Sequence, residues 1–184
     1  MGKKRVSIIP PQQREKQEDE LSWSQAFTDG VNYIYGFDYV SEPYWDEESI
    51  IDTKAVSASG QWPTLDIQLT HDKEIDFQPT GGIKQVKFNR EVLEEAINRK
   101  TSEMLEKYAL EQVEKTILLV QGYMPSQWAD DLDTPELKQA HKKNPFKGIY
   151  YVVPPLESEE SQIQEATGFV LPIKDCLAGL RLAQ

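Results

Sequence analysis

Two stretches, residues 50–57 (IIDTKAVS) and residues 65–70 (LDIQLT), decide the fold of this chain. Polar and apolar residues alternate strictly along the second stretch, which is typical of a half-buried strand. The segment between them contains Ser-Gly-Gln at residues 59–61, which is a turn signal. The two stretches are therefore predicted to pair as an antiparallel β-hairpin whose turn is centred on Gly60.

The register of this hairpin predicts a cluster of polar side chains. With Gly60 at the centre of the turn, Asp52 faces Gln68 and Lys54 faces Asp66. Directly opposed residues project from the same side of an antiparallel pair, so these four side chains gather on one face while the other face is apolar. A slip by one residue would mix the polar and apolar sets, and the pattern therefore favours this register.

Helical periodicity flanks the hairpin on both sides. A helical pattern begins at Glu20 and ends near Gly36, and a second helix follows Asn89, a good N-cap residue. The polar residues 12–20 fit either a disordered segment or the first turns of the first helix. We expect both helices to pack an apolar face on the sheet. The inward positions are predicted to be Trp23, Ala26, Phe27, Gly30, Val31 and Ile34 in the first helix, and Leu93, Ala96, Ile97, Met104, Leu105, Tyr108 and Ala109 in the second.

Continuous apolar runs in the second half predict further strands. Residues 116–120 (TILLV) and 148–153 (GIYYVV) are typical of strands covered on both faces. Residues 169–173 are predicted to form a last strand before a closing helix. Residues 41–48 and 124–147 are predicted to be loops, and residues 83–88 to hold a short strand.

This order of elements predicts a fold of the α/β class, with an α+β mixed sheet and helices packed on it. A chain of 184 residues is expected to form one domain. We expect that domain to span residues 12–184, after a flexible basic tail over residues 1–11.

Composition excludes several classes of protein. The only cysteine, Cys176, excludes an internal disulfide and a cysteine-cluster zinc site. The two histidines, His71 and His141, are expected at the surface. No apolar run approaches the roughly 20 residues that a membrane-spanning helix needs. The sequence therefore predicts a soluble, cytoplasmic protein without a membrane partner.

The predicted polar cluster has the chemistry of a divalent-cation site. Mg²⁺ prefers oxygen ligands, usually one or two carboxylates together with water and a phosphate group. A nearby ammonium can stabilise negative charge that develops on a phosphate. The same residues also fit a simpler interpretation, in which they form a solvated strand face and Lys54 forms a surface ion pair with Asp66.

The order helix, β-hairpin or meander, helix, strand, together with these residues, resembles the PD-(D/E)XK nuclease-like superfamily, the restriction-endonuclease-like domains. Its signature is an Asp on one hairpin strand and (D/E/Q)-x-K on the next. Asp52 matches the Asp, while Gln68 stands where the second half begins and Asp66 precedes it on the same face. Thr70 occupies the position of the signature lysine. The resemblance covers roughly residues 15–155.

This resemblance implies a Mg²⁺- or Mn²⁺-dependent nuclease that hydrolyses phosphodiester bonds in DNA or RNA. It implies metal ligation by Asp52, Asp66 and Gln68. In this superfamily an acid on the first helix can complete the metal site, which points to Glu20. Because the signature lysine is missing, Lys54 or Lys100 would replace it as the catalytic cation. Nucleic-acid contacts are then expected from four basic residues, Lys84, Lys87, Arg90 and Arg99.

A second interpretation also follows from the resemblance. The superfamily contains members that have lost activity and act as protein-interaction modules on the same fold. The missing lysine at Thr70 favours this interpretation, as does the net charge of −11 from 20 basic and 31 acidic residues, because nucleic-acid binding rests on clustered Lys and Arg. The clustering of Asp52, Asp66 and Gln68 favours the enzyme.

Overall fold

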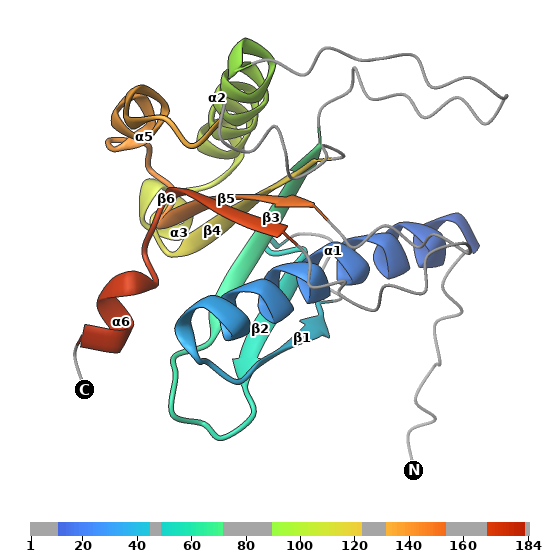
Figure 1. Ribbon diagram of the computed structural model, residues 1–184. Helices are drawn as coiled ribbons and strands as arrows, with labels where there is room; N and C mark the ends of the chain where they lie inside the picture. Colours follow the sequence, from blue (N-terminus) through green and yellow to red (C-terminus); the bar gives the residue numbers. More distant parts are fainter. Residues whose placement is uncertain (1–10, 45–48, 72–89, 123–131, 154–168, 183–184) are drawn as a thin grey trace, which may run out of the picture.

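The computed structural model describes residues 11–44, 49–71, 90–122, 132–153 and 169–182 (Figure 1). They form a six-stranded mixed sheet with helices on both faces, so the predicted α/β class with an α+β mixed sheet is confirmed. The elements are α1 (Pro11–Tyr35), β1 (Tyr39–Pro43), β2 (Thr53–Ser57), β3 (Leu65–His71), α2 (Arg90–Lys107), α3 (Leu110–Val113), β4 (Thr116–Gln121), α5 (Pro135–His141), β5 (Gly148–Val153), β6 (Phe169–Lys174) and α6 (Ala178–Leu182).

The strands follow one another across the sheet in chain order, from β1 to β6. β1, β2 and β3 form an antiparallel meander, β3, β4 and β5 are parallel, and β6 returns antiparallel to β5. The parallel step from β3 to β4 needs a crossover, and α2 lies in that connection. Figure 1 shows α1 on one side of the sheet and both α2 and α5 on the other.

α1 covers one face of the sheet. Its buried residues Trp23, Phe27 and Val31 belong to a core cluster that includes Ile67 of β3 and Leu119 of β4. The prediction that Ile34 is buried is wrong, because that side chain is 44% exposed. The chain leaves α1 immediately afterwards through Gly36, whose φ of 73° suits a helix C-terminal glycine, and Phe37 and Tyr39 supply the buried residues there.

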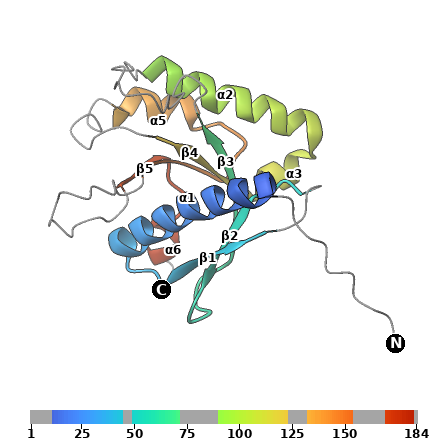
Figure 2. The same cartoon turned by 90° about the vertical axis from the view of Figure 1, so that its right-hand side faces the viewer.

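α2, α3 and α5 cover the opposite face, as the view in Figure 2 also shows. The buried residues Leu93, Ile97 and Met104 of α2 pack in one cluster with sheet residues that include Leu118. Leu105 was predicted on this inner side but is 44% exposed. Only one stripe of an amphipathic helix faces the core, and Met104 occupies that stripe here.

Two elements lie where loops were predicted. β1 falls partly in residues 41–48; it is a short edge strand and only its first residue, Tyr39, is buried, so it shows no alternation. α5 falls in residues 124–147 and carries ordinary start signals, since the Thr134 hydroxyl accepts from the Leu137 N–H and Pro135 opens the helix. His141, expected at the surface, is buried at 3% exposure because α5 packs on the core.

The structure decides between the two alternatives for residues 12–20. α1 begins at Pro11, so these polar residues form the first turns of the helix, and only the assignment of Pro11 to the tail is wrong. Residues 1–10 of the predicted basic tail, the predicted strand at residues 83–88, Lys84 and Lys87 lie outside the described residues. None of the described helices is long and apolar enough to cross a membrane.

Candidate functional site

The predicted hairpin register is confirmed, and it places Asp52 at the point where β2 begins. Thr53 faces Ile67 and Lys54 faces Asp66 in the antiparallel pair. The Asp52 N–H also donates to the Ile67 carbonyl at 2.8 Å, although Thr53 is the register partner of Ile67. Asp52 and Thr53 therefore both lie opposite Ile67 of β3, as in a β-bulge. Regular pairing of the hairpin stops at Asp52.

Where the strand pairing ends, the Asp52 carboxylate accepts hydrogen bonds from residues of β3. Its Oδ2 accepts from the Leu69 backbone N–H at 2.8 Å and from the Gln68 side-chain amide. The Gln68 Nε2 also reaches the Leu69 carbonyl at 3.3 Å, and the Gln68 side chain is buried. The predicted meeting of Asp52 and Gln68 is confirmed. An ionised carboxylate only accepts hydrogen bonds, so Gln68 presents its NH₂ group here, and a half-turn of the amide would present its oxygen instead.

Lys100 brings a positive charge to Asp52 from α2. Burial raises the pKa of Asp52, whereas the Leu69 N–H, Lys100, Lys16 and Gln68 all act to lower it. Burial lowers the pKa of Lys100, and the charge of Asp52 is the largest influence opposing that shift. Burial disfavours the charged form of each group, and the opposite charge of its partner partly offsets that cost.

α1 contributes a second acid and a second ammonium. The Lys16 Nζ lies 3.2 Å from the Glu20 Oε1. Burial raises the pKa of Glu20, and the negative charge of Asp52 raises it further, while Lys16 opposes both effects. We call Lys16, Glu20, Asp52, Gln68 and Lys100 the Asp52 cluster. The prediction from sequence omitted Lys16, although its position four residues before Glu20 places the two side chains on one helix face.

Among the residues that the structure describes, no hydrogen bond or ion pair joins Asp66 or Lys54 to the Asp52 cluster. Asp66 lines a separate cavity of about 420 Å³, together with residues that include Tyr108 and Lys115. The Lys54 ammonium lies 4.4 Å from the centre of the Tyr44 ring, a cation–π contact. The ion pairs found within the described ranges do not include one between Lys54 and Asp66.

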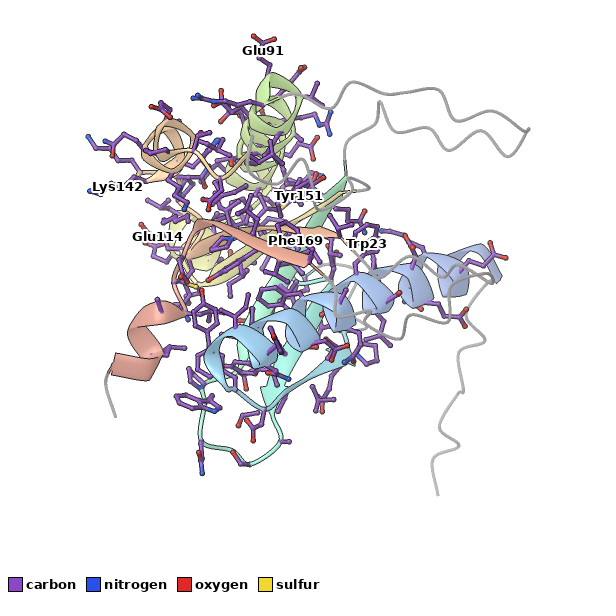
Figure 3. The ribbon with its side chains drawn as sticks, viewed as in Figure 1. Trp23, Glu91, Glu114, Lys142, Tyr151 and Phe169 are labelled. Atoms are coloured by element: carbon purple, nitrogen blue, oxygen red, sulfur yellow. The ribbon has the colours of Figure 1, made fainter. Side chains whose placement is uncertain are left out.

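The predicted nucleic-acid contacts on α2 have acidic neighbours. The Arg90 Nε lies 2.6 Å from the Glu94 Oε1. Arg99 lines an open surface pocket of about 500 Å³ together with Glu91, Glu94 and other residues of α2. Figure 3 shows Glu91 at the end of α2, pointing away from the sheet. This surface therefore carries both signs of charge.

The donor set of the Asp52 cluster comprises two carboxylates and one amide. In the part of the chain that the structure describes, no group of three or more His, Cys, Asp or Glu side chains could hold a metal ion. A centre with fewer protein ligands suits Mg²⁺, which keeps several waters and commonly binds through one or two carboxylates and a substrate phosphate. It does not suit zinc, which takes nitrogen and sulfur ligands in closed sites.

The position of the signature lysine is occupied by Thr70, which is buried at 7% exposure. Lys100 lies on α2 and is electrostatically coupled to Asp52. The described cations that act on Asp52 are thus on helices α1 and α2, and neither is on β3. The sequence matches no protein-family model and no curated protein.

Proposed function

We propose that this chain is a Mg²⁺- or Mn²⁺-dependent nuclease of the PD-(D/E)XK type, which hydrolyses phosphodiester bonds in nucleic acid. One observation carries the proposal. Asp52, at the end of regular hairpin pairing, contacts Gln68 on β3 and is electrostatically coupled to Lys100 on α2. Separate segments thus bring an acid, an amide and an ammonium together at the end of the hairpin.

The residues of the Asp52 cluster suit a hard cation. Asp52 and Glu20 would hold it through carboxylate oxygens, and Gln68 through its amide oxygen after a half-turn of the amide. Mutual repulsion between the two acids, which raises the pKa of Glu20, would be relieved by a bound cation. A divalent cation in such a site neutralises charge on a phosphodiester and makes water a better nucleophile.

Lys100 is the best candidate for the missing lysine. Its ammonium would stabilise negative charge on the phosphate oxygens as that charge develops, and the partly buried surroundings would strengthen this effect. Lys54, the other candidate, lies over the Tyr44 ring. Asp52 would keep Lys100 charged, because its carboxylate opposes the lowering of the lysine pKa by burial.

A protein-interaction module on the same fold is the second candidate. It is favoured by the net charge of −11 and by the acids Glu91, Glu94 and Glu95 along the α2 pocket. An acidic surface repels nucleic acid and suits a basic protein partner. In this case the Asp52 cluster would serve only to tie α1, the hairpin and α2 together.

Cleavage assays on single- and double-stranded DNA and RNA, with Mn²⁺ added, separate the two candidates. We expect the wild-type protein to cleave at least one of these substrates. Asp52→Asn should lower the rate roughly 100-fold or more, the usual cost of removing one group that stabilises the transition state. The matched control is Asp66→Asn, which removes a carboxylate from β3 that does not contact Asp52.

The nuclease predicts near-normal cleavage by Asp66→Asn and its loss in Asp52→Asn. Equal losses in both variants would contradict the assignment of the site to Asp52 and Gln68. Absence of cleavage of all four substrates by the wild-type protein would make the interaction module the better account.

A further inference from the structure

We infer that Lys16 is a built-in counter-ion of the Asp52 cluster, which holds Glu20 in the metal-free protein and is displaced from it when a divalent cation binds. This inference rests on the proposed function, because it needs a cation to occupy the cluster. It adds a residue outside the superfamily signature, and it predicts that Lys16 restrains metal binding.

The two partners of the ion pair have very different exposure. The Lys16 Nζ is 3.2 Å from the Glu20 Oε1, yet the Lys16 side chain is 72% exposed and that of Glu20 only 16% exposed. The carboxylate is therefore held inside while the ammonium reaches it from solvent. A lysine has a long flexible stem, so the ammonium can leave Glu20 and return to water without any movement of α1.

Stabilisation of α1 does not explain this pair. Within a helix, an acid placed four residues before a lysine is the favourable order, and here Lys16 precedes Glu20. The position of Lys16 is better explained by its ion pair with Glu20, an acid whose pKa is raised by burial and by the negative charge of Asp52.

Positive charge from Lys16 acts on both acids of the cluster. The Lys16 ammonium interacts with Glu20 most strongly and with Asp52 as well. On Asp52, the Gln68 NH₂ group supplies a second N–H donor. The metal-free cluster is thus satisfied internally, by an ammonium on Glu20 and an amide on Asp52. To bind both acids, a divalent cation must displace the Lys16 ammonium from Glu20 and turn the Gln68 amide so that its oxygen faces the cation.

Isothermal titration calorimetry of the full chain with Mn²⁺ tests the inference. Lys16→Gln removes the competing charge, so its Kd for Mn²⁺ should be roughly five- to tenfold lower than that of the wild-type protein, as expected for loss of one nearby like charge. Lys16→Arg keeps the charge and should bind like wild type. Lys142→Gln removes an exposed charge on the far side of the molecule, beyond α5, and controls for net charge (Figure 3).

Each outcome has a defined meaning. Saturable Mn²⁺ binding by the wild-type protein, with an equal or higher Kd for Lys16→Gln, would overturn the inference and leave the proposed function standing. An equal tightening in Lys142→Gln would also overturn it, because net charge would then be the cause. Absence of saturable heat from the wild-type protein would contradict the metal site itself, and with it both proposals. Far-UV circular dichroism of each variant checks that it is folded.

Discussion

His141 shows how burial of one residue couples stability to pH. Its side chain is buried, and within the described structure its Nε2 has no hydrogen-bond partner. Burial lowers the pKa of His141 below the usual value near 6.5, Arg90 lowers it further, and Glu94 opposes both. The folded state therefore takes up a proton less readily than the unfolded chain. Stability contributed by neutral His141 is present at neutral pH and is lost as pH falls from about 6.5 toward the lower pKa of the folded state.

We expect His141→Leu to reduce this loss. Urea unfolding at pH 8 and at pH 5 gives the free energy of unfolding of both proteins at each pH. The wild-type protein should lose more stability between the two pH values than the variant does, because the variant has no imidazole to protonate. Equal losses in the two proteins would show that His141 does not titrate on unfolding.

At the scale of residues, the site could be predicted where the alternation of side chains along paired strands determines which residues share a face. The alternation in residues 65–70 and the turn at Gly60 were sufficient to predict the register of the hairpin and the contact between the Asp52 and Gln68 side chains. Strand parity could not show that the regular pairing stops at Asp52. Asp66 is paired with Lys54 inside the regular hairpin, whereas Asp52 lies just beyond it. Nor could strand parity show that Lys16 and Glu20 interact electrostatically with Asp52, since that depends on where α1 crosses the sheet.

At the scale of elements, the strength of the local signal decided what could be predicted. β5 was predicted with the bounds that it has, Gly148–Val153, because it is buried on both faces and its sequence is a continuous apolar run. β1 owes its existence to pairing with β2, in which Val40 faces Val56, and its own five residues carry no period. An edge strand of this kind is defined by a long-range contact that local patterns do not contain.

Gly122, at the end of β4, is predicted to be intolerant of any side chain. A Cβ at this position would lie 1.9 Å from the Tyr151 ring, and that ring is buried at 1% exposure. Gly122→Ala should therefore lower the free energy of unfolding by about 1–3 kcal/mol, the usual cost of overpacking a core. Gly179→Ala is the matched control, since a Cβ there meets nothing within 4 Å.

Chemical denaturation of the two variants measures the difference. Gly179 lies in α6, where alanine is the better helix former, so Gly179→Ala should be neutral or stabilising. A Gly122→Ala protein as stable as the wild-type protein would show that Tyr151 can move aside and that the packing between β4 and β5 is looser than described.

At the scale of the whole molecule, topology assembles the Asp52 cluster. The meander fixes Asp52 beside Gln68, and the crossover from β3 to β4 carries α2, and with it Lys100, over the same end of the hairpin. α1 supplies Lys16 and Glu20 from the opposite side of the sheet. The sequence predicted each of these elements, but their meeting at one point depends on crossing positions that periodicity does not specify.

Thermal unfolding of the wild-type and Asp52→Asn proteins, each with Mn²⁺ and with a chelator, tests whether the Asp52 cluster binds a divalent cation. A ligand at 100 times its Kd that binds only the folded state stabilises it by about 2.7 kcal/mol, which corresponds to several degrees in Tm for a chain of this size. The wild-type Tm should rise by that amount with Mn²⁺. In chelator, Asp52→Asn should be at least as stable as wild type near neutral pH, because burial makes the charged form of Asp52 costly there. With Mn²⁺ the variant should gain little. An equal Mn²⁺-dependent rise in both proteins, or none in either, would contradict cation binding by the Asp52 cluster.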